Sequence, residues 1–449
     1  MISERSLLLA ERAVPRYTSY PTAPHFANVV GPDDMRAWLA GLDPGASLSL
    51  YLHVPYCRSI CHYCGCHTKA ALKDGALEVY ASGLVQEIDL LAHATQAKRV
   101  QHIHWGGGTP SLLGHARLRV IAERLRNRFD MAGIIEHAIE LDPRYVDDAL
   151  AEALAEIGVN RVSFGVQDIN ARVQKAIGRV QPAEQVERAV AAIRRAGINA
   201  INLDLMYGLP HQSEADVRRT AQWAASLKPG RLAIFGYAHV PWMKKHQTLI
   251  DTAALPGAGE RLAQAAAAAD ELIRAGYVAV GLDHFAAPGD TLALAARAGT
   301  LRRNFQGYTT DCADALLPLG VSSIGYLPQG YVQNASDFGA WKRAIEAGQF
   351  STARGLALSP GDRARATVIE RLMCDFAVDF GKIAAEMLGA SDALDDAIEP
   401  LDALAQDGVL VRDRRHVRVT EKARPFVRLA AACFDSYLQS ARARHSVAV

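Results

Sequence analysis

The sequence predicts an α/β fold: a partial, TIM-like (β/α)6 barrel followed by a mainly helical C-terminal domain. The first observation behind this prediction is that, from residue 47 onward, short apolar runs alternate with longer helical segments. The second is that motifs rich in glycine and polar residues fall where these apolar runs end, and parallel strands carry their chemistry at their C-terminal ends. The third is a shift in composition near residue 335, after which helical patterns dominate.

Six strand–helix units account for the first part of the chain. The first strand, 47–54, shows the alternation expected of a strand in Leu48, Leu50 and Leu52. Strands that alternate with helices form parallel sheets with right-handed crossovers, and six units are too few for an eightfold barrel, so we expect an open one. The predicted strands are 47–54, 100–105, 134–141, 159–166, 198–206 and 232–238, and the helices are 76–93, 115–129, 147–157, 183–196 and 214–226.

The rest of the chain predicts a helix at 258–275, a strand at 277–284 and a Gly-rich, loop-like stretch at 288–330. Near the end, a turn at 407–408 precedes a short hairpin and a helix at 422–442. This order also fits a winged-helix DNA reader, but the mixed charge favours a lid or docking domain. We therefore expect an N-terminal arm at 1–45, the barrel at 46–330 and the mainly helical domain at 331–449.

Composition narrows the possible classes of function. The chain has 449 residues, of which 50% are hydrophobic and 22% charged, and its net charge is +1, so no broad basic surface for nucleic acid is expected. It contains no apolar run of membrane-spanning length, and its N-terminus lacks the apolar core of a signal peptide. We expect a cytoplasmic protein with no nucleic-acid or membrane partner, and a monomer by default.

Four of the seven cysteines lie close together, at Cys57, Cys61, Cys64 and Cys66. The first three are separated by three and then two residues, so one tight loop can present three thiolates to an iron–sulfur cube. The fourth iron then has no protein ligand and can bind a small molecule. Cys66 is not expected to bind the same metal.

Two alternatives stand beside the cluster. Zinc could be bound by the cysteines together with His62 or His67. A structural disulfide fits less well, because nothing in the chain looks secreted.

The cysteine spacing, with the aromatic Tyr63 just before the third cysteine, resembles the radical S-adenosylmethionine (SAM) superfamily. The additional Cys66 narrows the resemblance to the oxygen-independent coproporphyrinogen III oxidases, from about residue 15 to about residue 440. The further motifs that carry it are RYTSYPTA at 16–23, GGGTP at 106–110, GVQD at 165–168, YGLP at 207–210 and NFQGYTT at 304–310.

The resemblance implies a barrel of the radical SAM type that holds a [4Fe–4S] cluster on Cys57, Cys61 and Cys64, with SAM on the fourth iron and two SAM molecules per chain. Cleavage of SAM would give a 5′-deoxyadenosyl radical that removes an unactivated propionate hydrogen. Loss of CO₂ and one electron would then leave a vinyl group. Two propionates of coproporphyrinogen III would react, giving protoporphyrinogen IX for haem biosynthesis. An electron donor of the flavodoxin or ferredoxin type and an unidentified acceptor would complete the reaction.

The resemblance also assigns site residues. The expected cofactor contacts are Tyr51, Tyr63, Gly107, Gly108, Thr109, Glu140, Gln167, Arg179, Asp204, Ala238 and Ile324. The residues expected at the reaction itself are Cys66, Glu140, Phe305 and Gln306.

The residues themselves leave alternatives open. A carboxylate such as Asp204 in an apolar strand is costly unless it is used, but Glu140 could be a solvating charge at a strand end. Arg179 could be a surface residue. Arg16, Arg302 and Arg303 are candidates for binding propionates, because arginine binds carboxylates in a bidentate manner.

Three other functions compete. The haem chaperones of the same superfamily share CxxxCxxC and GGGTP but lack Cys66 and the RYTSYPT arm. A haem-degrading radical enzyme would make linear tetrapyrroles. A structural iron–sulfur protein would not explain why Glu140, Gln167 and Asp204 all lie at strand ends.

Overall fold

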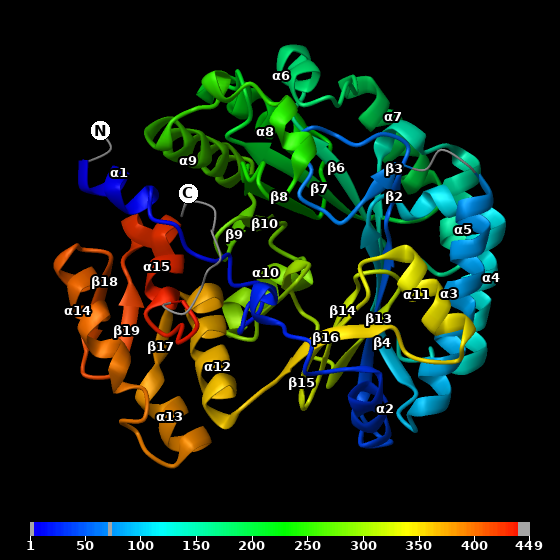
Figure 1. The fold of residues 1–449 in the computed structure, drawn as a ribbon. Coiled ribbons are helices and arrows are strands. Elements are labelled where there is room, and N and C mark those ends of the chain that lie inside the picture. The colour runs from blue at the N-terminus through cyan, green and yellow to red at the C-terminus, as the bar shows by residue number, and fades with distance from the viewer. Residues whose placement is uncertain (1–3, 71–73, 439–449) are drawn as a thin grey trace. The chain divides into compact units, whose positions relative to one another are not determined.

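The computed structural model describes residues 4–70 and 74–438, which fall into two compact units. Unit 1 consists of residues 1–25, 205–310 and 358–449, and unit 2 of residues 26–204 and 311–357. Both units therefore combine segments far apart in the sequence (Figure 1). The predicted division at residues 45 and 330 follows the chain rather than these contacts, and it stays a prediction.

Unit 2 contains the part of the sheet with the strand order β16-β15-β14-β13-β1-β4-β5-β6-β7, in which β7 belongs to this unit up to Asp204. Strand β1 pairs in parallel with both β4 and β13, and the parallel pairing continues from β4 to β5 and β6. The strands are β1 (Ser47–Val54), β4 (Arg99–Gly107), β5 (Glu136–Leu141), β6 (Arg161–Gln167), β7 (Ala200–Tyr207), β13 (Ala315–Leu319), β14 (Ile324–Leu327), β15 (Gly330–Asn334) and β16 (Thr352–Ala357).

Helices of unit 2 follow the strands in the predicted alternation, and α3, α4 and α5 lie along one side of the parallel strands in Figure 1. Most of the predicted strands and helices of the six units agree with the structure to within about two residues. The helices are α2 (Pro32–Ala40), α3 (Asp74–Ala94), α4 (His115–Arg128), α5 (Asp148–Glu156), α6 (Ala171–Ala176), α7 (Ala183–Arg195) and α11 (Phe338–Glu346).

Strand β1 is the buried centre of this sheet. Leu48, Leu50 and Leu52 have 0% exposure, and β1 has a parallel neighbour on each side. Strands covered on both faces are strongly apolar because they have no solvent side. The loop that carries the cysteines starts directly after this fixed strand.

Unit 1 contains a mainly helical C-terminal part and a group of short strands. Its apolar core joins the N-terminal arm, including Leu9 and Tyr17, to residues of the C-terminal helices such as Leu372 and Phe434. The helices are α1 (Glu4–Ala10), α8 (Glu214–Ser226), α9 (Ala258–Arg274), α10 (Thr291–Ala298), α12 (Pro360–Asp375), α13 (Phe380–Leu388), α14 (Ile398–Gln406) and α15 (Val427–Ala432). The strands are β8 (Arg231–Gly236), β9 (Val278–Val280), β10 (His284–Ala286), β11 (Arg302–Asn304), β12 (Gly307–Thr309), β17 (Ala377–Asp379), β18 (Leu410–Asp413) and β19 (His416–Val419).

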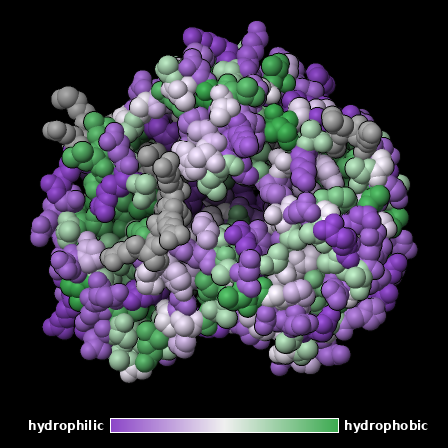
Figure 2. Space-filling view, in the orientation of Figure 1, coloured by the Kyte–Doolittle hydropathy of each residue, from purple (hydrophilic) through white to green (hydrophobic). Residues whose placement is uncertain are grey.

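The surface of unit 1 is not uniformly polar. Figure 2 shows hydrophobic residues gathered around α1, where Leu8 is 63% exposed. Among the described residues, no helix combines the length and apolar character that crossing a membrane would require.

The expectation that residues 288–330 are loop-like is wrong. The segment contains the helix α10 and the strands β11, β12, β13 and β14. These strands have three to five residues each, and β13 pairs with β1 from the other end of the sequence. Strands this short carry little periodicity of their own, so the sequence pattern does not reveal them.

Two other predicted elements differ from the structure. The single strand at 277–284 is instead an antiparallel pair, β9 and β10, with Gly281 at φ +58 between them. The helix at 422–442 is a 3-10 turn, Glu421–Phe426, followed by α15, because Pro425 interrupts the helix. Residues 439–442 of that prediction lie outside the described residues. The hairpin predicted after residue 408 is confirmed as β18 and β19.

Candidate active site

The cysteine loop runs from β1 to α3 and is closed at its base by two short parallel strands, β2 (Tyr56–Cys57) and β3 (Lys69–Ala70). The backbone N–H of Lys69 donates to Pro55 O at 2.7 Å, and that of His62 donates to Ile177 O at 2.9 Å. The loop is therefore fastened both to itself and to the end of α6. None of its four cysteines forms a disulfide.

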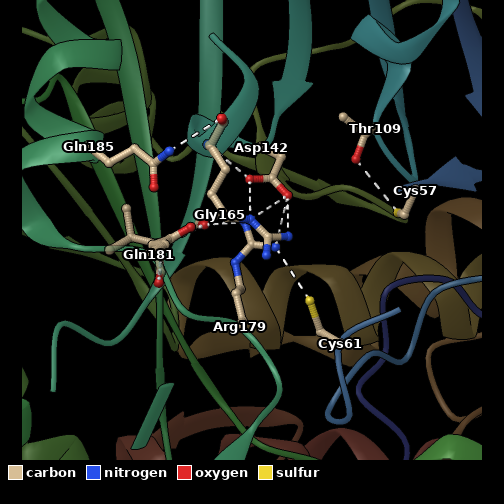
Figure 3. A network of polar contacts seen from close by, with 10 residues as sticks. Cys57, Cys61, Thr109, Asp142, Gly165, Arg179, Gln181 and Gln185 are labelled. Carbon is tan, nitrogen blue, oxygen red and sulfur yellow. Dashed lines mark hydrogen bonds and ion pairs between the residues drawn. The ribbon is translucent and has the colours of Figure 1, made fainter. Parts of the chain in front are cut away.

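Two hydrogen-bond donors point at the thiols of the loop (Figure 3). Thr109 Oγ1 lies 3.6 Å from Cys57 Sγ, and Arg179 Nη1 lies 3.5 Å from Cys61 Sγ. Burial raises the pKa of Cys57 to about 11, the Thr109 bond lowers it, and the neighbouring thiols of Cys64 and Cys61 raise it further. These sulfur atoms therefore lie close enough to affect one another's ionisation.

Cys66 differs from the other three because its side chain is held by Cys64. A hydrogen bond with Cys64, and then burial, raise the pKa of the Cys66 thiol. The residue is nevertheless classed as exposed, whereas Cys61 is buried. Its role stays a prediction.

Arg179 connects the cysteine loop to the ends of β5 and β6 (Figure 3). Its guanidinium donates to Gly165 O at 2.7 Å and to Asp142 Oδ2 at 3.3 Å. Burial alone would lower the pKa of Arg179, but Tyr63 and Asp142 raise it above its ordinary value. With 7% exposure, Arg179 is not the surface residue that the sequence left possible.

A second group of polar side chains lies across β1, β4 and β5. Tyr51 pairs in register with His104, and His104 Nε2 lies 3.1 Å from Glu140 Oε1. The other oxygen of Glu140 accepts from the backbone N–H of Gly107 at 3.1 Å. Burial alone would raise the pKa of Glu140, but the hydrogen bond and charge of His104 lower it. Glu140 is therefore a positioned carboxylate, not a solvating charge, although its side chain stays 39% exposed.

The glycine triplet after β4 is required by this packing. A Cβ at Gly107, whose φ is +103, would lie 2.5 Å from the ring of His53, and one at Gly106 would lie 2.9 Å from Glu140. At Gly108 it would lie 2.5 Å from Tyr56 O. The triplet thus lets the β4 end, the cysteine loop and Glu140 approach closely.

Gln167 and Asp204 extend the polar row along the sheet. Gln167 ends β6 in a left-handed backbone conformation, with φ +69, which is unusual for a residue with a side chain. Asp204 accepts hydrogen bonds from Ser163 Oγ and Asn202 Nδ2, both at 2.8 Å. Ser163 in turn is the register partner of Glu140, so both carboxylates belong to one face of unit 2.

Four predicted site residues lie elsewhere in their units. Ile324 begins β14 of unit 2. Ala238 of unit 1 follows β8, and its carbonyl accepts from Gln247 at 3.2 Å. Phe305 and Gln306 form the turn between β11 and β12, also in unit 1. Their roles stay predictions.

Sequence reasoning did not select three residues that organise the site: His53, His104 and Asp142. His53 lies between the hydroxyl of Tyr51, 3.0 Å away, and the carbonyl of His67, also 3.0 Å away. The period-two pattern of Tyr51 and His53 in β1, matched by His104 in β4, was a usable signal. Asp142 gave no such signal, because its partner Arg179 is 37 residues away.

The donor set fits an iron–sulfur cluster. Three cysteines outside any disulfide lie on one fastened loop, with a neutral and a cationic donor at two of the sulfur atoms. Thiolates are the usual ligands of such clusters. The described side chains are not gathered into a three-ligand metal group, so the fit is one of ligand chemistry and of the donors beside the sulfur atoms.

Comparisons with known proteins agree with this fold and site. The model of the radical SAM superfamily matches residues 51–224, and that of the HemN C-terminal domain matches residues 358–426. Fold and cysteine loop together define a radical SAM protein, a class that uses a [4Fe–4S] cluster and SAM.

Whole-chain relatives narrow the class. The chain is 45% identical over 450 residues to the oxygen-independent coproporphyrinogen III oxidase of Bradyrhizobium diazoefficiens, covering 100% of both chains. It is 44% identical to that of Paracoccus denitrificans, covering 98% of both chains. It belongs to the family of oxygen-independent coproporphyrinogen III oxidases. The solved structure of coproporphyrinogen III oxidase (HemN) from Escherichia coli, described as a radical SAM enzyme, matches with a TM-score of 0.88 and 35% identity, covering 95% of this chain and 100% of that one. The predicted fold class is thereby confirmed.

Proposed function

We propose that the protein is an oxidoreductase that converts coproporphyrinogen III to protoporphyrinogen IX without oxygen, by oxidative decarboxylation of two propionates to vinyl groups. The observation that carries this proposal is similarity along the whole chain to relatives that bear this name. The cysteine triad and the positioned Glu140 supply the matching chemistry in unit 2.

The residues have separate tasks in this proposal. Cys57, Cys61 and Cys64 hold the cluster, and the bound cluster and SAM supply the one-electron chemistry that removal of an unactivated hydrogen requires. Glu140, fixed by His104 and Gly107, binds the SAM beside the cluster.

The remaining polar contacts support a second SAM. Arg179 suits a carboxylate, and Asp204 suits a pair of ribose hydroxyls. Tyr63 lies in the cysteine loop and acts electrostatically on Arg179, and Gln167 ends β6. Two decarboxylations consume two SAM molecules, so a second bound molecule is chemically sensible.

The two substrate-facing assignments are also part of the proposal. Cys66, beside the triad, donates hydrogen or positions substrate, and Phe305 and Gln306 contact the tetrapyrrole. An electron donor of the flavodoxin or ferredoxin type reduces the cluster, and a separate acceptor takes the electron left after CO₂ is lost.

The test is anaerobic reconstitution with iron and sulfide, followed by incubation with coproporphyrinogen III, SAM and a strong reductant. Chromatography and mass spectrometry should detect protoporphyrinogen IX, and 5′-deoxyadenosine should form with it. Formation of a linear tetrapyrrole, or stable haem binding without turnover, would contradict the proposal.

A further inference from the structure

Four arginines from separate parts of unit 1 lie together: Arg16 of the N-terminal arm, Arg261 of α9, Arg303 of β11 and Arg428 of α15. Arg16 Nη2 donates to Gly236 O at 2.7 Å. Arg303 Nη2 donates to the backbone oxygen of Arg16 at 3.3 Å. The arm and β11 are therefore joined through their arginines.

Arg303 is also held in place by an aromatic ring. Its guanidinium lies 4.4 Å from the ring centroid of Tyr308, and its Nε donates to Tyr17 O at 3.2 Å. Its Nη1 is buried and has no hydrogen-bond partner within the described residues. The guanidinium is thus fixed in position with one donor still available.

Arg261 occupies space that two glycines leave for it. Its guanidinium lies 5.7 Å from the ring centroid of Tyr207. A side chain at Gly208, whose φ is +81, would collide with Arg261 Nη1, and one at Gly236 would lie 3.2 Å from Nη2. The YGLP motif therefore shapes the backbone around a guanidinium group.

Arg428 adds the most buried positive charge of the group, at 6% exposure. Burial, and then repulsion from Arg16, lower the pKa of Arg428 to about 10, while Tyr207 and Asp283 oppose that shift. It remains charged at neutral pH. A buried guanidinium among other guanidinium groups is costly unless an anion balances it.

Among the described groups that act on Arg16, Arg303 and Arg428, Asp283 supplies the carboxylate. Burial would raise the pKa of Asp283, but a hydrogen bond from His284 at 2.7 Å and the arginine charges lower it to about 2. Asp283 is thus already ionised and already engaged. A further carboxylate could accept a hydrogen bond from Arg303 Nη1, which is buried and has no partner among the described residues.

We propose that Arg16, Arg261, Arg303 and Arg428 form a binding site for propionate carboxylates of the tetrapyrrole substrate. This inference rests on the proposed function, and it names the substrate group that unit 1 recognises. Arginine suits the task because its planar donors match a carboxylate in a bidentate manner. Arg302, on the same strand as Arg303, is instead paired with Glu370 at 2.9 Å and is 49% exposed.

The test measures binding of coproporphyrin III, a tetracarboxylate probe, to the reconstituted, SAM-loaded protein by fluorescence anisotropy. Arg261→Gln and Arg428→Gln should each weaken binding about ten- to hundredfold, the range expected for the loss of a charged hydrogen bond. Raising the salt concentration should weaken binding to wild type more than to either variant.

Two further variants separate recognition from structure. Arg302→Gln is the matched control and should bind within about twofold of wild type. Asp283→Asn removes the opposing negative charge and should strengthen the binding of coproporphyrin III. Weaker binding to this variant would mean that Asp283 only holds the arginines in place. The Arg261 side chain is only half-buried. If Arg428→Gln does not fold, the affinity of Arg261→Gln therefore decides the question.

Each result has one meaning. Unchanged affinity in folded Arg261→Gln, or no measurable binding of coproporphyrin III to wild type, would overturn the arginine site. A wild-type protein that binds coproporphyrin III but does not convert coproporphyrinogen III would contradict the proposed function and support the site.

Discussion

The sulfur atoms of Cys57 and Cys61 receive hydrogen bonds from residues outside the loop, whereas Cys66 is bound by its neighbour Cys64. Replacing Cys57, Cys61 or Cys64 by Ser should therefore remove the cluster absorbance at ~400 nm and all activity, because each thiolate holds one iron. Cys66→Ser should keep the iron and lose activity. Iron and sulfide analysis of the four variants decides this, and iron loss in Cys66→Ser would refute the three-ligand assignment.

Glu140 is positioned by a side chain and by a backbone amide at the same time. Glu140→Gln preserves its size but removes its charge, so SAM affinity should fall about ten- to hundredfold while the cluster remains. His104→Phe should weaken SAM binding less, because Gly107 still holds the carboxylate. Equilibrium dialysis with SAM measures both effects, and normal 5′-deoxyadenosine production by Glu140→Gln would rule out the assignment.

Replacing Asp204 tests whether the protein binds a second SAM molecule. Asp204→Asn should leave the cluster and the first SAM intact and should lower bound SAM from two per chain toward one. Dialysis at saturating SAM gives the stoichiometry. A wild-type value of one, unchanged in the variant, would mean that Asp204 only bridges Ser163 and Asn202.

At the scale of elements, one buried carboxylate fixes α3 to the ends of β13 and β15 and to α11. Glu87 accepts hydrogen bonds from Gly320 N at 2.6 Å, Asn334 Nδ2 at 2.8 Å and Trp341 Nε1 at 3.2 Å. Glu87→Ala removes the acceptor of Gly320 N and of Trp341 Nε1, whereas Asn334 Nδ2 keeps Gly320 O at 3.0 Å. The change should cost about 3 kcal/mol or more in unfolding free energy. Glu78→Ala, on the exposed side of α3, should cost about 0–1 kcal/mol. Urea midpoints compare the two.

The same elements show what sequence alone can predict. Strand β1 was predicted at its observed bounds, because its apolar alternation is local. Strand β13 was missed, because its five residues are too short for a clear alternation and its neighbour β1 is far away in the sequence. Glu140 was found because the family resemblance assigns it to SAM and it ends an apolar strand. His104 and Asp142 were not, because their importance depends on contacts across strands.

At the scale of the whole molecule, two buried groups should give opposite pH dependences of stability. The pKa of Glu87 is raised from 4.5 to about 7 by burial, so its contribution to stability falls as pH rises through that window, by about 3 kcal/mol. The pKa of His137 is lowered from 6.5 to about 4 by burial and by Arg126, so its contribution falls by a similar amount as pH drops through its window. The two changes in unfolding free energy with pH should nearly cancel between pH 4.5 and 6.5.

Replacing one of the two residues should reveal the pH dependence of stability that the other one causes. Glu87→Gln leaves the His137 effect, so Tm should fall on acidification from pH 6.5 to 4.5. His137→Gln leaves the Glu87 effect, so Tm should fall as pH rises from 5 to 7. Thermal melts at several pH values measure this, and parallel profiles for both variants would show that other groups set the pH dependence.

The pairing of β1 with β13 also has a consequence during synthesis. Ser47, at the start of β1, hydrogen-bonds to Asp314, 267 residues later in the chain. At ribosomal speeds of about 5–20 residues per second, the partner strand emerges roughly 15–50 s after β1. Throughout that interval, β1 has an open edge that can pair with other nascent chains. Chains released before residue 315 should therefore aggregate, and iron delivered to the cysteines in that interval would meet a loop whose supporting strand is still unpaired on one side.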